Sequence, residues 1–515
     1  MKPLFNSIRI KRPKRNVFDL SHERKLSLNM GDLVPIMVQD VVPGDKFQVS
    51  SEILMRLAPL ISPVMHRVNV YTHYFFVPNR LIWNAWEDFI TGGENGNLAP
   101  VFPKISFTTT DYTAGLLKAG SLADYLGIPH AGSAPYKFKA VSALPFRAYQ
   151  MIYNDYYRDQ NLTPKIDFGI GSTELDGYDT AEIAKLATLR KRVWEKDYFT
   201  SALPWAQRGG EVSLPTTVDY LDISKMVKSD GSNLSADEYA AGKGSVDSNN
   251  MQAQGAGADN DASIRIENIE GIDVTINDLR RSIKLQEWLE KNARGGSRYI
   301  EQILSHFGVI SSDARLQRAE YLGGGKQPVV ISEVLNTTGT EDLPQGNMAG
   351  HGISVGSSNR FKKTFEEHGF VIGIMSVLPR TAYQQGMERQ WLKFDKFDYF
   401  WPEFANLGEQ VIDSDEIHWD WGTNEAPVEF GYQSRYAEYK FKNSSVHGEF
   451  RNTLNHWHLG RIFDTRPGLN QTFIESNPSH RIFAVDDPEV HKLYCQIFNN
   501  VRAIRPMPVF GTPTL

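Results

Sequence analysis

The sequence predicts a mainly β protein, an antiparallel sandwich elaborated by long insertions that contain helices. Three observations lead to this prediction. Runs of β-branched and aromatic residues recur along the chain and are bounded by Gly and Pro. Long intervals separate these runs, and some intervals have helical spacing. Strands and helices do not alternate regularly, which argues against a parallel sheet wound from βαβ units.

The composition fits a large folded protein without covalent cross-links. The chain has 515 residues, 41% of them hydrophobic, with 10 Trp, 21 Tyr and 28 Phe. Cys495 is the only cysteine, which excludes an internal disulfide and a multi-cysteine metal site and fits a reducing cytoplasm. No apolar run approaches the ~18 residues of a membrane span, and no apolar signal core follows the basic N-terminus. We therefore expect neither membrane insertion nor conventional export.

The predicted strands are distributed over most of the chain. Leu33–Gln39 and Lys46–Ser50 flank a turn at Pro43-Gly44-Asp45, which predicts a hairpin. Further strands are predicted at Val68–Val77, Pro328–Asn336, Gly369–Pro379 and Ser434–Lys442. In Val68–Val77 both faces carry bulky, mostly apolar side chains, whereas a strand of a lone sandwich should alternate apolar and polar residues. A second layer must therefore cover this strand.

Three longer segments have helical spacing. Ser142–Leu162 begins at a capping Ser, and Asn277–Gly296 begins at a capping Asn and ends at a Gly pair. Ser297–Gly308 follows the same logic. A shorter helix is expected after Pro78, ending at Gly92-Gly93. The helices lie in the intervals between the strands and are therefore expected in insertions.

The chain divides into four predicted segments. They are a basic N-terminal arm (1–30), the first part of the sandwich with helical insertions (31–210), a variable surface insertion (211–271), and the second part with loop insertions and a C-terminal arm (272–515). The insertion is dense in Gly, Ser, Asn, Asp and Ala, a composition that buries too little apolar surface to order itself in isolation. Loops of this length in a compact chain are usually functional.

Candidate metal and phosphate sites are weak. His456 and His458 could share one side of a strand, but no third ligand is evident, and a polar aromatic-rich surface is the favoured interpretation. The acidic stretch Asp413–Trp421 lacks the spacing of an EF-hand loop, so a solvated turn is favoured over Ca²⁺ binding. Gly323–Gly325 and Gly350–Gly356 lack the P-loop and dinucleotide-binding patterns and are expected to be flexible loops.

Catalytic signatures are also absent. The sequence has no GxSxG elbow, and Cys495 has no sequence signature of an activated nucleophile. A carboxylate pair for glycoside cleavage stays open, because Asp and Glu are abundant and nothing singles out a pair. We predict that the protein is not an enzyme and binds no cofactor.

The basic arm is the main electrostatic signal. It concentrates positive charge on a chain whose formal net charge is −6. Such arms bind phosphates through counterion release, and the alternative is a solubilising tail. Arg502 and Arg505 could add weakly to a basic surface. Five basic residues of the arm cluster between positions 9 and 15, namely Arg9, Lys11, Arg12, Lys14 and Arg15.

Several long blocks resemble the major capsid protein of the microviruses, small icosahedral bacteriophages with single-stranded DNA, and most closely the gokushovirus branch. The resemblance covers nearly the whole chain except the segment 211–271. The blocks are RVNVYTHYFFVPNRLIWNAWEDFITGG (67–93), FDLSHERKLSLNMGDLVPI (18–36), VVPGDKF (41–47), LPFRAYQMIYNDYYRDQNL (144–162), RLQRAEYLGG (315–324), VLPRTAYQQGMERQW (377–391) and YFWPEFANLGEQ (399–410).

The resemblance implies an eight-stranded jelly roll of the viral capsid type. It implies that sixty copies form a T=1 shell around circular single-stranded DNA, with the insertion as a three-fold protrusion for host attachment. The implied partners are other copies of the chain, the viral DNA, a small basic DNA-packaging protein, an internal scaffolding protein, a pilot protein and a bacterial cell-surface receptor. The implied location is the virion, assembled in the host cytoplasm.

The resemblance also gives the site residues an interpretation. The arm is expected to contact the genome at the inner surface of the shell. Packing against the chain's own insertions or a neighbouring subunit is expected for Tyr71, His73, Phe75, Trp83 and Trp86. Two alternatives are a carbohydrate-binding or glycan-cleaving β-sandwich and a cytoplasmic nucleic-acid-binding protein that forms no shell.

Overall fold

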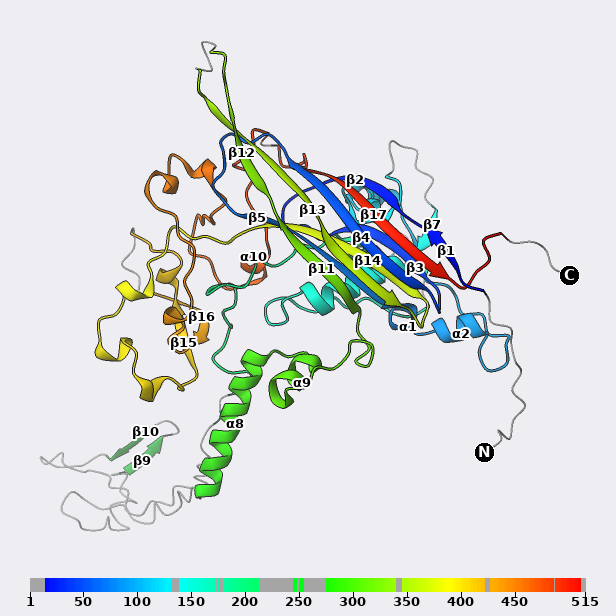
Figure 1. The fold of residues 1–515 in the computed structure, drawn as a ribbon. Coiled ribbons are helices and arrows are strands. Elements are labelled where there is room, and N and C mark those ends of the chain that lie inside the picture. Colours follow the sequence, from blue (N-terminus) through cyan, green and yellow to red (C-terminus); the bar gives the residue numbers. More distant parts are fainter. Residues whose placement is uncertain are drawn as a thin grey trace, which may run out of the picture. The chain divides into compact units, whose positions relative to one another are not determined.

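The computed structural model divides the chain into two compact units, residues 1–206 with 295–515, and residues 207–294. Each unit is described by itself (Figure 1). The described residues are 14–130, 139–172, 174–175, 179–210, 212, 244–247, 250–253, 275–339, 345–421, 427–485 and 487–510.

The larger unit is an antiparallel jelly roll of two sheets (Figure 1). One sheet has the order β1–β17–β4–β13–β12, with β2 also pairing with β17. The other has the order β11–β5–β14–β3. Their bounds are β1 Asn16–Asp19, β2 His22–Leu28, β3 Val34–Val41, β4 Lys46–Leu57, β5 Val68–Pro78, β11 Glu320–Pro328, β12 Val330–Leu335, β13 Met348–Thr364, β14 Gly369–Pro379 and β17 Leu493–Arg505.

The strand order confirms the predicted fold class. β1 and β2 pair with successive parts of β17 and act as one interrupted edge strand, while β12 extends the sheet beyond β13. When β1 and β2 count as one strand and β12 is left out, eight strands form two four-stranded sheets. The chain crosses repeatedly from one sheet to the other, as in a jelly roll. The core between the sheets includes Ile53, Val70 and Met375.

The predicted hairpin at Pro43-Gly44-Asp45 is wrong, because β3 and β4 lie in different sheets. The turn instead pairs with the connection between β13 and β14. The N–H of Gly44 donates to the carbonyl of Phe365, and the N–H of Phe365 donates to the carbonyl of Asp45, both at 2.8 Å. A local turn signal does not reveal that the two strands that follow it separate.

Burial along the strands explains the unusual composition of Val68–Val77. In β4 buried and more exposed residues alternate, as expected for a sheet with one solvated face. In β5 every residue is buried except the half-buried His73. Phe75 and Val77 belong to a cluster with Ile82 and Phe146, which come from the insertions. The predicted second layer is therefore confirmed, and the chain's own helices supply it.

The helices begin and end near the predicted residues, with two differences. The segment after Pro78 forms two short helices, α1 (Asn79–Ile82) and α2 (Trp86–Thr91), and α2 ends at Gly92, whose φ of +79° favours glycine. The helix predicted from Ser142 to Leu162 is shorter, because α5 spans Leu144–Ile152 and continues as a π-helical turn to Tyr157.

Two glycine segments expected to be flexible loops are strands. Gly323–Gly325 lies in β11 and Gly350–Gly356 in β13. A Cβ atom on Gly324 would lie 2.4 Å from the carbonyl oxygen of Thr72, and one on Gly350 would lie 2.3 Å from that of Ser62. Glycine at these positions therefore permits close backbone approach rather than flexibility.

The strand predicted at Ser434–Lys442 is also wrong. β16 (Glu429–Ser434) ends where that strand was expected to begin. Tyr436 then takes a left-handed conformation with φ 61°, and Ala437–Tyr439 forms a 3₁₀ turn. The N–H of Tyr436 donates to the side chain of Gln410 at 2.8 Å, which holds the reversed backbone.

The remaining elements lie in the insertions. In the smaller unit, α8 spans Ile276–Gly295, close to its predicted bounds, and begins after Thr275, whose hydroxyl accepts from the N–H of Asp278. Most of the predicted insertion 211–271 lies outside the described residues. The other elements are α3 Thr109–Thr113, α4 Leu122–Leu126, α6 Thr180–Ala187, α9 Tyr299–Phe307, α10 Gln471–Ile474, β6 Lys104–Ser106, β7 Ala140–Ser142, β8 Glu174–Leu175, β9 Gly244–Asp247, β10 Asn250–Ala253 and β15 Glu409–Asp413.

Candidate functional site

The long connection between β14 and β17 exposes a group of large aromatic side chains. Phe394 is 88% exposed and Trp391 is 67% exposed, so the described residues cover only a small part of these two side chains. We call the group the aromatic surface. Its members are Trp391, Phe394, Phe397, Tyr399, Phe400, Trp401, Tyr439 and Phe441. These residues are close in the sequence, between 391 and 401 and at 439 and 441. Large apolar patches are rare on monomeric soluble proteins and mark protein contacts.

The segment that carries Phe394 is held by turns rather than by long helices or strands. Three short 3₁₀ helices span Arg389–Trp391, Lys396–Asp398 and Pro402–Phe404. Asp398 accepts hydrogen bonds from the backbone N–H groups of Asp395 (2.8 Å) and Phe394 (2.9 Å), and these bonds lower the pKa of its carboxyl. The backbone next to Phe394 is thus fixed although its ring is exposed.

A buried ion pair lines the same cavity as Tyr439 and Phe441 of the aromatic surface. Arg389 Nη1 lies 2.9 Å from Glu416 Oε1, and the Tyr198 hydroxyl donates to Glu416 Oε2 at 2.9 Å. The Glu416 side chain is only 3% exposed. Burial raises the pKa of Glu416 and outweighs the opposing effect of Arg389. Losing either partner would leave a buried charge without compensation.

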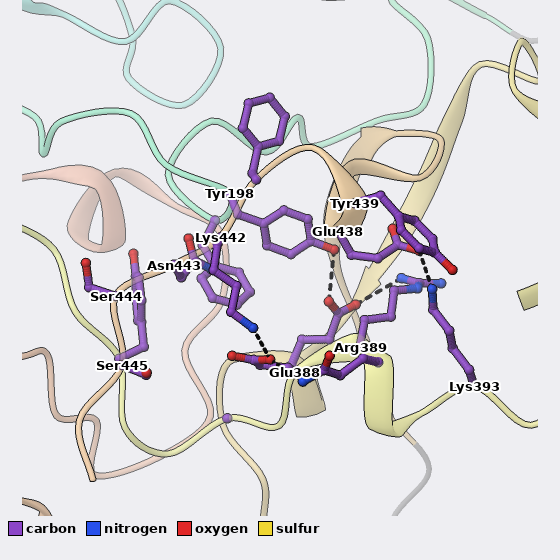
Figure 2. A pocket seen from close by; sticks show the side chains of 16 residues that line it. Tyr198, Glu388, Arg389, Lys393, Glu438, Tyr439, Lys442, Asn443, Ser444 and Ser445 are labelled. Atoms are coloured by element: carbon purple, nitrogen blue, oxygen red, sulfur yellow. Dashed lines mark hydrogen bonds and ion pairs between the residues drawn. The ribbon is translucent and has the colours of Figure 1, made fainter. Parts of the chain in front are cut away.

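A second buried ion pair contacts the aromatic surface directly. Lys393 Nζ lies 3.1 Å from Glu438 Oε1 and 3.8 Å from the centre of the Tyr439 ring (Figure 2). Gln410 donates to Glu438 Oε2 at 2.7 Å. Burial acts to raise the pKa of Glu438, but the bond from Gln410 and the pairing with Lys393 lower it overall. The position of the Tyr439 ring is therefore fixed by a cation–π contact on a paired lysine.

A cavity of about 160 Å³ lies between these pairs, and three carboxylates line it. Glu416 pairs with Arg389, Glu438 with Lys393, and Glu388 with Lys442 (Figure 2). A glycoside hydrolase needs one carboxyl group as a proton donor and another as base or nucleophile. Because each carboxylate here is engaged by its own cation, the arrangement serves to hold the connecting segments together.

Comparison with known proteins decides the family. Residues 6–515 match the family described as capsid protein (F protein). The chain belongs to this family. Its sequence is 37% identical to capsid protein VP1 of Chlamydia phage 1, over 100% of this chain and 98% of that protein. It is 35% identical to capsid protein VP1 of Bdellovibrio phage phiMH2K and 31% identical to that of Spiroplasma virus 4, in each case over 97% of this chain and 95% of the relative.

Family membership confirms the resemblance to microvirus capsid proteins of the gokushovirus type. A capsid protein is a structural component of the virion that assembles with further copies into a shell, and this role is structural rather than enzymatic. In the described part of the capsid protein, no helix combines the length and apolar character needed to cross a membrane.

The predicted packing residues on β5 lie mostly inside the capsid protein. Tyr71 is buried, its hydroxyl donates to Glu195, and Arg192 lies 4.1 Å from the centre of its ring. His73 is half-buried, and its Nδ1 lies 2.8 Å from the Tyr157 hydroxyl. Burial lowers the pKa of His73 to about 4, and the neighbouring charge of Arg192 adds to this effect.

The other three predicted residues show how far the chain's own insertions cover β5. Phe75 packs on Tyr156 with ring centres 4.8 Å apart. Trp83 is fully buried, and its indole N–H donates to Ser172 at 2.9 Å. These two side chains are fully covered within the single chain, so their packing is against the chain's own insertions, the first of the two alternatives stated above. Trp86 is half-buried and, like His73, leaves part of its ring for a neighbour.

The basic arm is described only in part. Lys14 and Arg15 are exposed, while Arg9, Lys11 and Arg12 lie outside the described residues. Residues 16–28, predicted to belong to the arm, form β1 and β2, which pair with β17. Arg505 Nη2 lies 3.2 Å from Asp45 Oδ2, and its guanidinium lies over Phe47, so it is less free for phosphate than the exposed Arg502.

The structure does not place the two histidines of the HWH motif side by side on one strand. Asn455–Trp457 is a 3₁₀ turn rather than the predicted strand, so the two rings do not share a strand face. His458 is buried, donates from Nε2 to the carbonyl of Phe450 at 2.8 Å and accepts at Nδ1 from the N–H of Gly460 at 2.9 Å. Across the described residues, no group of three or more His, Cys, Asp or Glu could hold a metal ion. In Asp413–Trp421, Ser414–Glu416 forms a short 3₁₀ turn, in keeping with the prediction of a turn.

The aromatic surface itself was not predicted from the sequence. Its signal is the density of Trp, Phe and Tyr between 391 and 404, interrupted by Lys and Asp and without the period of a helix or strand. Aromatic residues without such a period could not be assigned to a core face.

Proposed function

We propose that this protein is the major capsid protein whose sixty copies form a T=1 icosahedral shell around a circular single-stranded DNA genome. The observation that carries the proposal is the aromatic surface. Its side chains are exposed in one chain, while buried ion pairs fix the segments that carry them. Membership of the capsid protein family supports the same function. A shell needs surfaces that are rigid before they meet, because pre-organisation lowers the entropic cost of association.

The chemistry of the aromatic surface suits contacts between copies. Aromatic residues are enriched at the centre of protein interfaces, where they bury a large area with few rotatable bonds. Copies related by five-fold or three-fold axes meet through different patches on each side. We therefore place the aromatic surface in a contact of this kind, against a different surface of the next copy.

The basic arm is proposed to contact the genome from the inside of the shell. Lys14 and Arg15 are exposed next to β1, and Arg9, Lys11 and Arg12 precede them in the sequence. Cations of this kind neutralise phosphates without reading sequence, so the contact should weaken as salt rises. A small basic DNA-packaging protein, an internal scaffolding protein and a pilot protein are the further proposed partners.

The insertion at 211–271 is proposed to attach the virion to a bacterial cell-surface receptor from three-fold protrusions. Its polar, Gly-rich and Ser-rich composition gives it little part in a core, which supports a surface role. Assembly is proposed to take place in the bacterial cytoplasm, in agreement with a chain that has only Cys495 as a thiol.

Electron microscopy of particles purified from infected cells tests the proposal. We expect uniform spherical particles that contain this chain and DNA protected from nuclease. A soluble monomer that cleaves or binds glycans, with no particles under any condition, would support the carbohydrate-active alternative and overturn the proposal.

A further inference from the structure

β12 leaves one of its edges without a pairing strand among the described residues. In the described part of the chain it is the last strand of its sheet, and its other edge pairs with β13 from Val330 opposite Ile353 to Leu335 opposite Met348. Figure 1 shows β12 at the outside of the sheet, with the β12–β13 hairpin running beyond the other strands. The free edge therefore presents backbone N–H and C=O groups that can pair with another strand.

The side chains of β12 favour such pairing rather than preventing it. Its sequence is VISEVL, and Val330 and Val334 are 58% and 51% exposed. Proteins usually protect an edge strand with Lys, Pro, a bulge or a covering segment. β12 contains no Lys or Pro, and its pairing with β13 has no register shift. An exposed β-branched edge of this kind is a template for a second strand.

We propose that β12 pairs edge to edge with β12 of a second copy of this chain across a two-fold axis, so that two jelly rolls share one continuous sheet. The inference rests on the proposed function, because an icosahedral shell supplies two-fold axes between neighbouring copies. Two antiparallel copies of one strand make an isologous contact, in which each side presents the same residues.

Symmetry restricts the register of this contact. A two-fold axis perpendicular to the sheet places one residue opposite its own copy, and the overlap of two β12 strands is longest when that residue is Ser332 or Glu333. With Glu333 on the axis, two carboxylates would lie directly opposite each other, which is destabilising. With Ser332 on the axis, Val330 of each copy lies opposite Val334 of the other, and two hydroxyls meet at the centre.

The register centred on Ser332 also matches the exposure of the strand. Val330, Ser332 and Val334 project from one face, and all three are exposed in the single chain. Pairing joins them to the same three residues of the second copy in one stripe. β-branched pairs and hydroxyl pairs across strands are both favourable. The only charged residue of the strand, Glu333, lies on the opposite face, where it stays exposed.

A cysteine cross-link tests the register directly. The native cysteine, Cys495, is buried, so the variant Ser332→Cys in the full chain adds an accessible thiol. Residues opposite each other in an antiparallel pair have Cβ atoms about 4.5–5.5 Å apart, close to the separation that a disulfide spans. Val355→Cys is the matched control, because Val355 is 72% exposed in β13 but pairs with Leu54 of β4 and lies two residues beyond the part of β13 that pairs with β12.

After mild oxidation of purified particles, we expect Ser332→Cys to run mainly as a covalent dimer that a reducing agent converts back to monomer. Val355→Cys should stay monomeric. A Ser332→Cys chain that stays monomeric in intact particles, that cross-links no more than Val355→Cys, or that links to a different polypeptide would overturn the inference. Absence of particles from the wild-type chain would instead contradict the proposed function.

A charge variant gives an independent result where the cysteine variant fails to assemble. Ser332→Lys would place two ammonium groups opposite each other on the axis. We expect the yield of particles to fall at least tenfold at low salt and to recover in part at high salt, where the repulsion is screened. Val355→Lys should assemble like the wild type. An unchanged particle yield for Ser332→Lys would overturn the inference.

Discussion

Two aromatic regions of this capsid protein use the same residue types in opposite ways. Around β5, Phe75 and Trp83 are buried beneath helices that the chain itself provides. On the aromatic surface, Trp391 and Phe394 project from a segment fixed by turns and buried ion pairs. The first region completes the fold of one chain. The second region has a fixed backbone, but the described residues leave its rings exposed.

The difference shows that a high aromatic content predicts burial of the rings. It does not show whether the same chain or another copy covers them. Around β5 the covering helices belong to the same chain, with α1 directly after the strand and α5 at Leu144–Ile152, so the cover comes with folding. The aromatic surface has no such segment in the described part of the chain, and we propose that other copies of the capsid protein cover it. Mutations should therefore affect stability in the first region and assembly in the second.

The largest effect on stability is expected for Trp83→Ala. Trp83 is fully buried and packs against Phe89 and Phe102, with ring centres 4.9 and 5.2 Å away. Removing a buried aromatic side chain costs about 3–5 kcal/mol through lost transfer energy and a cavity. Urea unfolding of the unassembled chain measures the change in the free energy of unfolding. A loss below about 1 kcal/mol would show that the region around β5 is not a core.

The next largest effect is expected for the ion pair between Lys393 and Glu438, which contacts the aromatic surface. Lys393→Met leaves the Glu438 carboxylate buried without its cation, and we expect a loss of about 3 kcal/mol. The double variant Lys393→Met with Glu438→Gln removes both charges and should recover most of that loss. Urea unfolding of the two variants provides the comparison. Equal stability of both variants would mean that the ion pair does not hold the segment.

A smaller effect is expected for the pH dependence of the region around β5. Burial lowers the pKa of His73 to about 4, below its ordinary value of 6.5. The unfolded chain therefore takes up a proton between pH 6.5 and 4 while the folded chain does not, so stability is lost as the pH falls through this range. Allowing for the partial exposure of the ring, the loss attributable to His73 is about 2 kcal/mol.

Urea unfolding at pH 7 and pH 4.5 measures this dependence, with His73→Gln as the comparison. The variant should lose less stability than the wild type between the two pH values. A wild-type chain whose extra loss at pH 4.5 matches that of His73→Gln would contradict the assignment to His73.

The smallest effect on stability is expected on the aromatic surface. The double variant Trp391→Ser with Phe394→Ser should change the free energy of unfolding by no more than about 0.5 kcal/mol, because exposed side chains contribute little to the fold. The yield of particles should nevertheless fall strongly, as sedimentation of the assembled fraction would show. Normal assembly of a stable variant would remove these two residues from the interface.

The sequence predicted the covered strand β5 because both of its faces carry bulky side chains, a local pattern that needs no knowledge of the partner. The glycine end of α2 at Gly92 was equally local. The turn at Pro43-Gly44-Asp45 misled because the separation of β3 and β4 depends on β13 and β14, more than 300 residues away in the chain. Turn signals report chain reversal and say nothing of which sheet each strand joins.

The functional surfaces were predicted less well than the fold. The basic arm was visible as a charge run, although Asn16–Leu28 turned out to lie in β1 and β2. The aromatic surface has no period, and the cavity beside it is lined by residues that are distant in the sequence, such as Tyr198 and Glu416. The exposure of a loop residue depends on how the whole chain folds. The pattern of residues along the sequence therefore does not predict it.

Hydroxyl-radical footprinting of intact particles and of the unassembled chain tests the central claim that other copies cover the aromatic surface. We predict that Trp391 and Phe394 react several-fold less in particles, while the fully buried Trp83 reacts equally little in both states. Equal reactivity of Trp391 and Phe394 in particles and in the unassembled chain would contradict the account.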